Sequence, residues 1–223
     1  YIQKGYNTTM SSLLEDIYGA ISVFSNKTPQ QIKGNAKEFQ LDVLTRVITT
    51  LLGKNSKVLR NVYVPYAKNT KTTEIDMILL MNGNIFVFEV KNYSCTIVGK
   101  QSEKDWKTIY TKDKTYTMYN PIMQNKGHIS TLATYLKVPE DSMYSVIVFS
   151  ESADISKVQY SKSSKLTVTT MNDIVSTITK LSKNKPKYSK QQMDTLYQTI
   201  KPLTKVSKAV KEQHIKDVSK DKH

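Results

Sequence analysis

The sequence contains little cysteine, glycine or arginine. Its one cysteine, Cys95, excludes an internal disulfide and a cysteine-rich zinc site, and it fits a reducing compartment such as the cytoplasm. The seven glycines form neither a Walker phosphate loop nor a dinucleotide-binding fingerprint. No run reaches the ~18 consecutive apolar residues of a membrane span, and no charged-apolar-small signal peptide opens the chain. The chain begins at Tyr1 rather than Met, which leaves room for a membrane anchor outside this sequence.

Positive charge is in large excess over negative charge. The 223 residues include 33 lysines and arginines against 19 aspartates and glutamates, a net charge of +14, and only Arg46 and Arg60 are arginine. Residues 180–223 alone carry 12 lysines and four acidic residues, a net of +8. Such an excess favours an anionic partner, either nucleic acid or an anionic membrane surface. The lysine-rich end can be interpreted as a solvated spacer or as a nonspecific phosphate-binding arm.

Apolar periodicity and turn signals predict a mixed sheet flanked by helices, an α/β (α+β) fold. With 39% hydrophobic residues, the chain has enough apolar surface for one large core. We expect helices over residues 9–24, 35–52, 121–136, 171–181 and 189–200, and Asn120-Pro121 opens the third of them. We expect strands over residues 57–66, 73–81, 84–92, 96–99, 106–110, 115–119, 144–149 and 166–169.

The pair Asn82-Gly83 predicts a two-residue hairpin turn, because both residues accept positive φ angles. Residues whose numbers sum to 165 then face each other, whereas a slip of two residues would make the opposed pairs diagonal. One face contains the pairs Leu80 and Ile85, Ile78 and Val87, Asp76 and Glu89, and Glu74 and Lys91. The other face is entirely apolar, so we expect it to be buried; its pairs are Leu79 and Phe86, Met77 and Phe88, and Ile75 and Val90.

The first of these faces changes abruptly from apolar to acidic. Directly opposed residues have Cβ atoms ~4.5–5.5 Å apart, so the carboxylates of Asp76 and Glu89 repel each other unless a proton or a cation neutralises them. Mg²⁺ suits this role, since it takes one or two protein carboxylates and keeps waters and phosphate oxygens as its other ligands. Lys91 lies on the same face, where it can reach a phosphate or a metal-bound water. The alternative interpretation is an edge hairpin with a solvated acidic patch.

The same residues resemble the PD-(D/E)xK nuclease signature, and a longer pattern resembles the nuclease-related domain family, NERD. An isolated ExK is weak evidence, whereas five blocks in order, with fitting elements between them, are specific. The position after Tyr93, often glycine in this family, is Ser94 here, beside an otherwise intact catalytic trio. The marks between Gly34 and Ser150 are Gly34 through Glu38, Glu74-Ile75-Asp76, Glu89-Val90-Lys91-Asn92-Tyr93, Gly99, Trp106 and Asn120-Pro121-Ile122-Met123-Gln124.

The resemblance implies a restriction-endonuclease-like fold with a metal-dependent catalytic site. It implies that Asp76 and Glu89 hold Mg²⁺ or Mn²⁺, with the Val90 carbonyl as a third ligand, and that Lys91 is the catalytic lysine. Glu38 matches the acidic residue of the first core helix and Gln124 the glutamine of a later helix, and both would orient water or metal. For Glu38 the alternative is an ordinary first-turn glutamate, which the helix dipole favours.

We divide the chain into an N-terminal helical extension, residues 1–33, the nuclease-related domain, residues 34–203, and a basic lysine-rich tail, residues 204–223. His128 lies four residues after Gln124 on one helix face, but we favour a packing role for it. Trp106 is expected in the core rather than as a base-stacking platform. We expect the two tail histidines, His214 and His223, to be inert.

These features predict a metal-dependent nuclease that hydrolyses phosphodiester bonds of nucleic acid, DNA rather than RNA, in repair, processing or defence against foreign DNA. Contacts mainly to backbone phosphates would make its binding sequence-tolerant and salt-sensitive. No small-molecule cofactor is expected. One alternative is a nucleic-acid-binding scaffold with a nuclease-like fold and no useful turnover. Another is a membrane-associated adaptor that docks through the basic tail.

Overall fold

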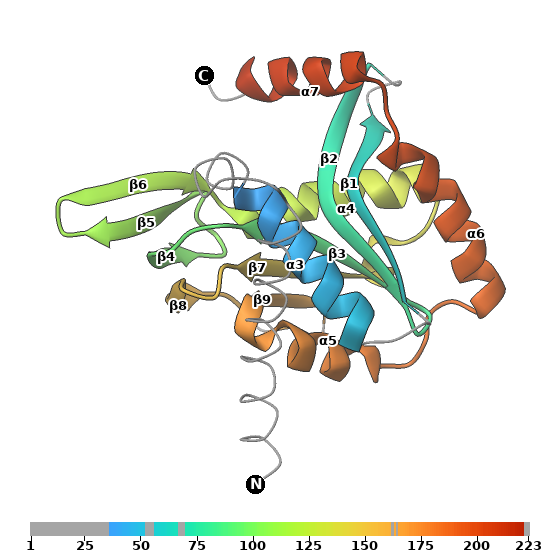
Figure 1. The fold of residues 1–223 in the computed structure, drawn as a ribbon, viewed down its shortest axis with the longest axis horizontal. Helices are drawn as coiled ribbons and strands as arrows, with labels where there is room; N and C mark the ends of the chain where they lie inside the picture. The colour runs from blue at the N-terminus through green and yellow to red at the C-terminus, as the bar shows by residue number, and fades with distance from the viewer. Residues whose placement is uncertain (1–35, 52–55, 67–69, 162, 164, 221–223) are drawn as a thin grey trace, which may run out of the picture.

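The protein, here as a computed structural model, forms two β-sheets flanked by helices (Figure 1). The structure describes residues 36–51, 56–66, 70–161, 163 and 165–220. The extension of residues 1–33, with the helix expected over residues 9–24, lies outside the described residues. Parallel and antiparallel strands occur together, which confirms the expected α/β class with a mixed sheet.

Sheet A has the strand order β1-β2-β3-β7-β9, and sheet B has the order β6-β5-β4-β8. In sheet A the first three strands are antiparallel neighbours, whereas β3, β7 and β9 run parallel. The sequence patterns predicted all of these strands except β8, in which no residue is buried and no apolar alternation signals a strand. The bounds are β1 Ser56–Tyr66, β2 Lys71–Met81, β3 Asn84–Lys91, β4 Thr96–Lys100, β5 Asp105–Thr111, β6 Lys114–Tyr119, β7 Met143–Phe149, β8 Asp154–Gln159 and β9 Leu166–Thr170.

Helices cover both faces of sheet A. On one face, α3 and α5 pack against Met77, Phe86 and Phe88, and on the other, α4 and α6 pack against Ile78 and Val87. Within the described residues, no helix combines the length and the apolar character needed to cross a membrane. The helices are α3 Ala36–Leu51, α4 Pro121–Leu136, α5 Ile174–Ser182, α6 Lys190–Ile200 and α7 Lys208–Lys220, with short 3-10 turns at Glu140–Ser142, Met171–Asp173 and Lys201–Thr204.

The hairpin between β2 and β3 has the predicted turn and register. Asn82 and Gly83 have φ angles of 49° and 70°, and the ladder pairs Leu80 with Ile85 and continues to Met77 opposite Phe88. The turn also lies against the chain after α5, because the Gly83 carbonyl accepts from the N–H groups of Lys187 and Tyr188 at 2.9 and 3.0 Å. A Cβ on Gly83 would lie 2.4 Å from the Tyr188 carbonyl oxygen, so this close approach also requires glycine.

The expected pairing is wrong beyond Met77, because β2 leaves β3 there and continues only beside β1. Glu74 is opposite Tyr63 of β1 rather than Lys91, and Ile75 packs with Val62 in the α4 and α6 layer rather than with Val90. The change of face coincides with Asn61 of β1, which has a φ of 50° between two paired residues. A left-handed residue interrupts the alternation of side chains, which period-two reasoning from a single hairpin cannot detect.

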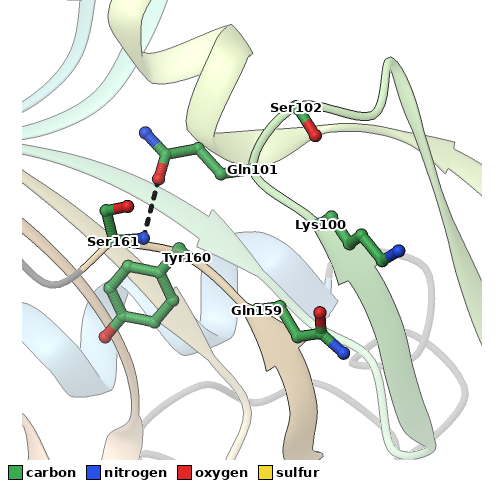
Figure 2. A pocket seen from close by; sticks show the side chains of 6 residues that line it. All are labelled: Lys100, Gln101, Ser102, Gln159, Tyr160 and Ser161. Carbon is green, nitrogen blue, oxygen red and sulfur yellow. Dashed lines mark hydrogen bonds between the residues drawn. The ribbon is translucent and has the colours of Figure 1, made fainter.

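Asn120 joins the start of α4 to the turn between β4 and β5. As predicted, its side chain caps the helix, accepting at Oδ1 from the Ile122 N–H at 2.9 Å. Its Nδ2 donates to three carbonyls of the turn, those of Lys100, Gln101 and Glu103. Figure 2 shows a pocket of about 640 Å³ at the outer side of this turn, where Gln101 accepts a hydrogen bond from the Ser161 N–H at 2.9 Å.

Candidate active site

Asp76 lies at the point where β2 leaves β3. The next N–H along β3 that faces β2, that of Val90, donates to Asp76 Oδ2 at 2.8 Å. The carboxylate therefore takes the place of a backbone carbonyl at the end of the hairpin ladder, and Asp76 is only 2% exposed. The divergence of two strands thus buries an acidic side chain and fixes its orientation.

Glu89 projects from β3 and is completely buried. Its Oε2 lies 3.2 Å from His128 Nε2, and its Oε1 lies 2.7 Å from Lys91 Nζ. The contact with Lys91 is an ion pair without hydrogen-bond geometry, so Oε1 accepts no hydrogen bond from the described residues. A buried carboxylate oxygen in this state is an available ligand for a cation.

Lys91 connects the carboxylates to α4. It is the last residue of β3, and its Nζ donates to Gln124 Oε1 at 2.9 Å while it also contacts Glu89. Gln124 lies in the first turn of α4, at a position set by the Asn120 cap. The structure therefore brings together four of the five predicted side chains: Asp76, Glu89, Lys91 and Gln124.

His128 belongs to this cluster, although the sequence pattern favoured a packing role for it. Its Nε2 faces Glu89 Oε2, and its Nδ1 lies 2.7 Å from Thr73 Oγ1. Because a carboxylate only accepts, Nε2 donates to Glu89, and Thr73 Oγ1 is the hydrogen-bond partner of Nδ1. The spacing of four residues from Gln124 was the one signal in the sequence that could have found it.

Lys37 is the second side chain that sequence reasoning missed. It projects from the first turn of α3, and its Nζ lies 2.5 Å from Asp76 Oδ1. Burial alone would lower the pKa of this ammonium group, but the carboxylates of Asp76 and Glu89 raise it above the ordinary lysine value. No local pattern marks Lys37 in a chain with so many lysines.

Glu38 points elsewhere. Its carboxylate contacts Arg60 Nη2 and Asn61 Nδ2, each at 3.1 Å, and its side chain is 47% exposed. These contacts are on β1, at the residue where that strand changes face. The structure thus places Glu38 beside the cluster and Lys37 within it, and an orienting role for Glu38 stays a prediction.

The pKa values of the two buried carboxyl groups are shifted in opposite directions. Burial and the neighbouring Glu89 carboxylate raise the pKa of Asp76 to about 6, although Lys37 and the Val90 N–H oppose this effect. Burial also opposes ionisation of Glu89, but Lys91, His128 and Lys37 together lower its pKa below the ordinary value. Glu89 is therefore the permanent anion of the pair, and Asp76 is the member whose charge depends on a nearby cation.

This donor set suits Mg²⁺ better than a metal that needs many protein ligands. Among the described residues no group of three or more histidine, cysteine, aspartate or glutamate side chains could hold a metal ion. Mg²⁺ needs only one or two carboxylates, since waters and phosphate oxygens complete its coordination. Asp76 and Glu89 would supply these two, and Glu89 Oε1, which accepts no hydrogen bond from the described residues and pairs with the Lys91 ammonium group, fits the chemistry.

A mixed sheet between helices, with two carboxylates and a lysine where two of its strands separate, defines a restriction-endonuclease-like protein. The chain belongs to the nuclease-related domain family, whose sequence model matches residues 33–150. This range contains every member of the cluster, including Lys37, Thr73 and His128.

A search of curated protein sequences finds a relative whose name states no activity. The chain is 28% identical over 185 residues to the uncharacterized protein pXO1-01 of Bacillus anthracis, and the alignment covers 82% of each chain. No solved structure matches the chain significantly. The family therefore establishes a nuclease-related protein, and its chemistry has to be argued from the site.

Proposed function

We propose that this protein is a nuclease of the PD-(D/E)xK type that requires Mg²⁺ or Mn²⁺ and hydrolyses phosphodiester bonds of DNA. The observation that carries the proposal is the buried pair Asp76 and Glu89, with Lys91 in contact with Glu89. Burying two carboxylates side by side is unfavourable unless cations accompany them. Without a catalytic role for the two carboxylates, apolar residues at both positions would make the folded protein more stable.

Asp76 and Glu89 are the proposed metal ligands, with the Val90 carbonyl as a third. When bound, Mg²⁺ or Mn²⁺ would polarise the scissile phosphate and lower the pKa of a coordinated water. The ammonium group of Lys37 supports a cation site here, because it already places one positive charge against Asp76 Oδ1. We propose that Lys37 exchanges this contact for a phosphate oxygen of the substrate.

The remaining side chains position charge around the reacting phosphate. The hydrogen bond from Lys91 Nζ to Gln124 fixes the position of the ammonium group, which can orient the attacking water, stabilise the hydroxide that forms from it and offset the charge that develops on the phosphate. His128 holds Glu89 Oε2, which leaves Oε1 turned toward Lys91 and the proposed ion. Thr73 in turn holds the His128 ring.

Cleavage assays with circular and linear DNA in Mg²⁺, Mn²⁺ or EDTA test this proposal. We expect cutting only with a divalent ion, and none from Asp76→Ala or Glu89→Ala, because each variant lacks one ligand of the ion. Asp154→Ala is a matched control, since it removes an exposed carboxylate of β8.

Two outcomes would contradict the proposal. If Asp76→Ala cuts as fast as the wild type, the activity belongs to another site or to a contaminant. If the wild type retains DNA without a divalent ion and never cuts it, the protein is a nucleic-acid-binding scaffold with a nuclease-like fold.

A further inference from the structure

A two-stranded ribbon, formed by β5 and β6, projects from the body of the protein (Figure 1). Three tyrosines of the ribbon are exposed: Tyr110 by 42%, Tyr116 by 54% and Tyr119 by 47%. The Tyr110 side chain is hydrogen-bonded to the buried Cys95, but rings that are about half exposed leave much of their surface outside the core. They therefore require a separate explanation.

One face of the ribbon continues the protein core outward. Near the base, Trp106 lies opposite Met118, and both are buried against the rest of sheet B. One step further out, Thr108 lies opposite Tyr116, and the Tyr110 ring, at an irregularity of the pairing, packs edge-on against the Tyr116 ring with 6.1 Å between the ring centres. The apolar face of the ribbon thus ends in two rings that the core does not cover.

These rings line a pocket whose wall includes a residue close in sequence to the candidate active site. The pocket has a volume of about 370 Å³, and its lining includes Tyr93, Tyr110, Lys114 and Tyr116. Tyr93 follows Lys91 by two residues, and the Tyr93 carbonyl accepts a hydrogen bond from Ser150 Oγ just beyond β7. The ring-lined pocket is therefore connected to the end of β3 by a short, fixed stretch of chain.

The charge of the ribbon matches an anionic strand. Three lysines within residues 105–119, at positions 107, 112 and 114, outnumber the two aspartates, Asp105 and Asp113. None of these lysines forms an ion pair with any residue that the structure describes, and Lys114 Nζ lies 5.6 Å from the centre of the Tyr110 ring. Aromatic rings beside uncompensated lysines are the combination that binds single-stranded nucleic acid, through base stacking and phosphate contacts.

We propose that the ribbon binds an unpaired DNA strand, whose bases stack on Tyr110 and Tyr116 and whose phosphates contact Lys112 and Lys114. A duplex offers these rings no free base faces, whereas a single strand or a frayed end does. This proposal rests on the proposed nuclease function, because cleavage of the bound strand would occur at the carboxylate site. It assigns unpaired or end-frayed DNA as the preferred substrate.

Binding of the full-length chain in EDTA tests the ribbon without any cleavage. Fluorescence anisotropy would be measured with an oligothymidylate of about 16 nucleotides and with a blunt duplex of the same length. We expect Tyr110→Ala and Tyr116→Ala each to weaken binding of the single strand about tenfold and to change duplex binding less than twofold. Tyr110→Phe and Tyr116→Phe keep the ring and should bind like the wild type.

Two further variants complete the design. Tyr135→Ala removes an exposed tyrosine of α4 and should leave single-strand binding unchanged. Lys114→Gln should reduce the slope of log affinity against log salt by about 0.7, the value for one phosphate contact on a single strand. Thermal unfolding of each variant checks that the ribbon is folded.

The ribbon proposal and the nuclease proposal can fail separately. The ribbon proposal is overturned if the alanine variants bind the single strand like the wild type, or if they lose single-strand and duplex binding equally. If ring-dependent single-strand binding is found but no divalent ion supports cleavage, the ribbon proposal stands and the nuclease proposal falls.

Discussion

At the scale of single residues, two neighbouring side chains of α3 contact different partners. Lys37 and Glu38 are adjacent on α3, yet Lys37 contacts Asp76 whereas Glu38 contacts Arg60 and Asn61. Successive helical residues point about 100° apart, so only one of the two can face the carboxylates. The buried charges are thereby matched by cations from two sides, Lys37 from α3 and Lys91 from β3.

Lys91 and Gln124 should show distinct defects in catalysis. Lys91→Ala removes a charge close to the reacting phosphate, so we expect cleavage to fall at least ~10²-fold while a divalent ion still binds. Gln124→Ala only releases the lysine, and we expect a milder loss of about tenfold. Single-turnover cleavage rates and Mn²⁺-dependent thermal shifts would separate the two effects.

Lys57→Ala is the matched control for these variants, because it removes an ion pair with Asp194 on α6, outside the cluster. Its cleavage rate should equal that of the wild type. A Lys91→Ala protein that cuts normally would remove the lysine from the mechanism.

The raised pKa of Asp76 makes stability without metal depend on pH. Since this pKa is about 6 against an ordinary 3.8, the folded protein binds more protons than the unfolded chain between about pH 4 and pH 6. The free energy of unfolding should therefore fall as pH rises through this window, by at most ~3 kcal/mol. The lowered pKa of Glu89 acts in the opposite direction, but mostly at lower pH, below about 4.5.

Urea unfolding in EDTA across this pH range measures the effect. Asp76→Asn cannot ionise and should flatten the slope, whereas a divalent ion should stabilise the wild type more at pH 7 than at pH 5. A stability that rises from pH 4 to pH 6 in EDTA would contradict the assignment.

At the scale of elements, the lysine-rich end forms a helix that docks on the body of the protein. His214 Nδ1 of α7 lies 2.9 Å from the Thr72 carbonyl oxygen of β2, to which it donates, and the ring packs edge-on against Tyr63. The sequence pattern treated His214 as inert; the structure gives it a docking contact, and the absence of a functional role stays a prediction. Figure 1 shows α7 across the start of β2, the strand that carries Asp76.

The position of α7 bears on whether the lysine-rich end binds phosphate. Deleting residues 205–223 should weaken DNA binding and flatten its salt dependence, by about 0.9 for each duplex phosphate that a deleted lysine had neutralised. His214→Ala loosens the helix but keeps every lysine, so its salt slope should stay close to that of the wild type. An unchanged slope after the deletion would return these lysines to the role of a solvated spacer.

At the scale of the whole molecule, α4 links sheet A to sheet B. Asn120 holds the β4–β5 turn of sheet B with its Nδ2, while Gln124 and His128 of the same helix reach the carboxylate cluster on sheet A. Helix α4 therefore contacts the turn at the base of the proposed strand-binding ribbon through Asn120, and the proposed catalytic side chains through Gln124 and His128. A change in this connection should affect both.

Asn120→Ala tests that link. The variant loses a helix cap and the Nδ2 hydrogen bonds to the turn, although the Lys100 carbonyl keeps Trp106 Nε1 and the Glu103 N–H as donors, so we expect destabilisation by about 2–3 kcal/mol. Cleavage should fall further than in Gln124→Ala, since Gln124 and His128 move together. Asn120→Asp keeps the cap but turns an acceptor instead of a donor toward the carbonyls of the turn, and urea unfolding of both variants compares the loss of the cap with the loss of the turn contacts.

Local rules explain which parts of the fold and the site could be predicted. The Asn82-Gly83 turn, the hairpin register, the Asn120 cap and the acidic positions of β2 and β3 all follow from the φ preferences and side-chain periods of short segments. Trp106 was correctly expected in the core, where its ring lies so close to Gly99 that a Cβ there would be 2.2 Å from it. Interactions within about ten residues determined these features.

The acid pair, the lysine beside it and the class of fold could thus be derived from the sequence alone. Three features required the tertiary structure: Lys37 rather than Glu38 contacts Asp76, His128 holds Glu89, and Ile75 changes layer. The physical reason is that each of these depends on where β2 separates from β3 and how α3 and α4 pack over that gap. The contacts of Lys37 with Asp76 and of His128 with Glu89 each join residues 39 apart, and no local pattern encodes them.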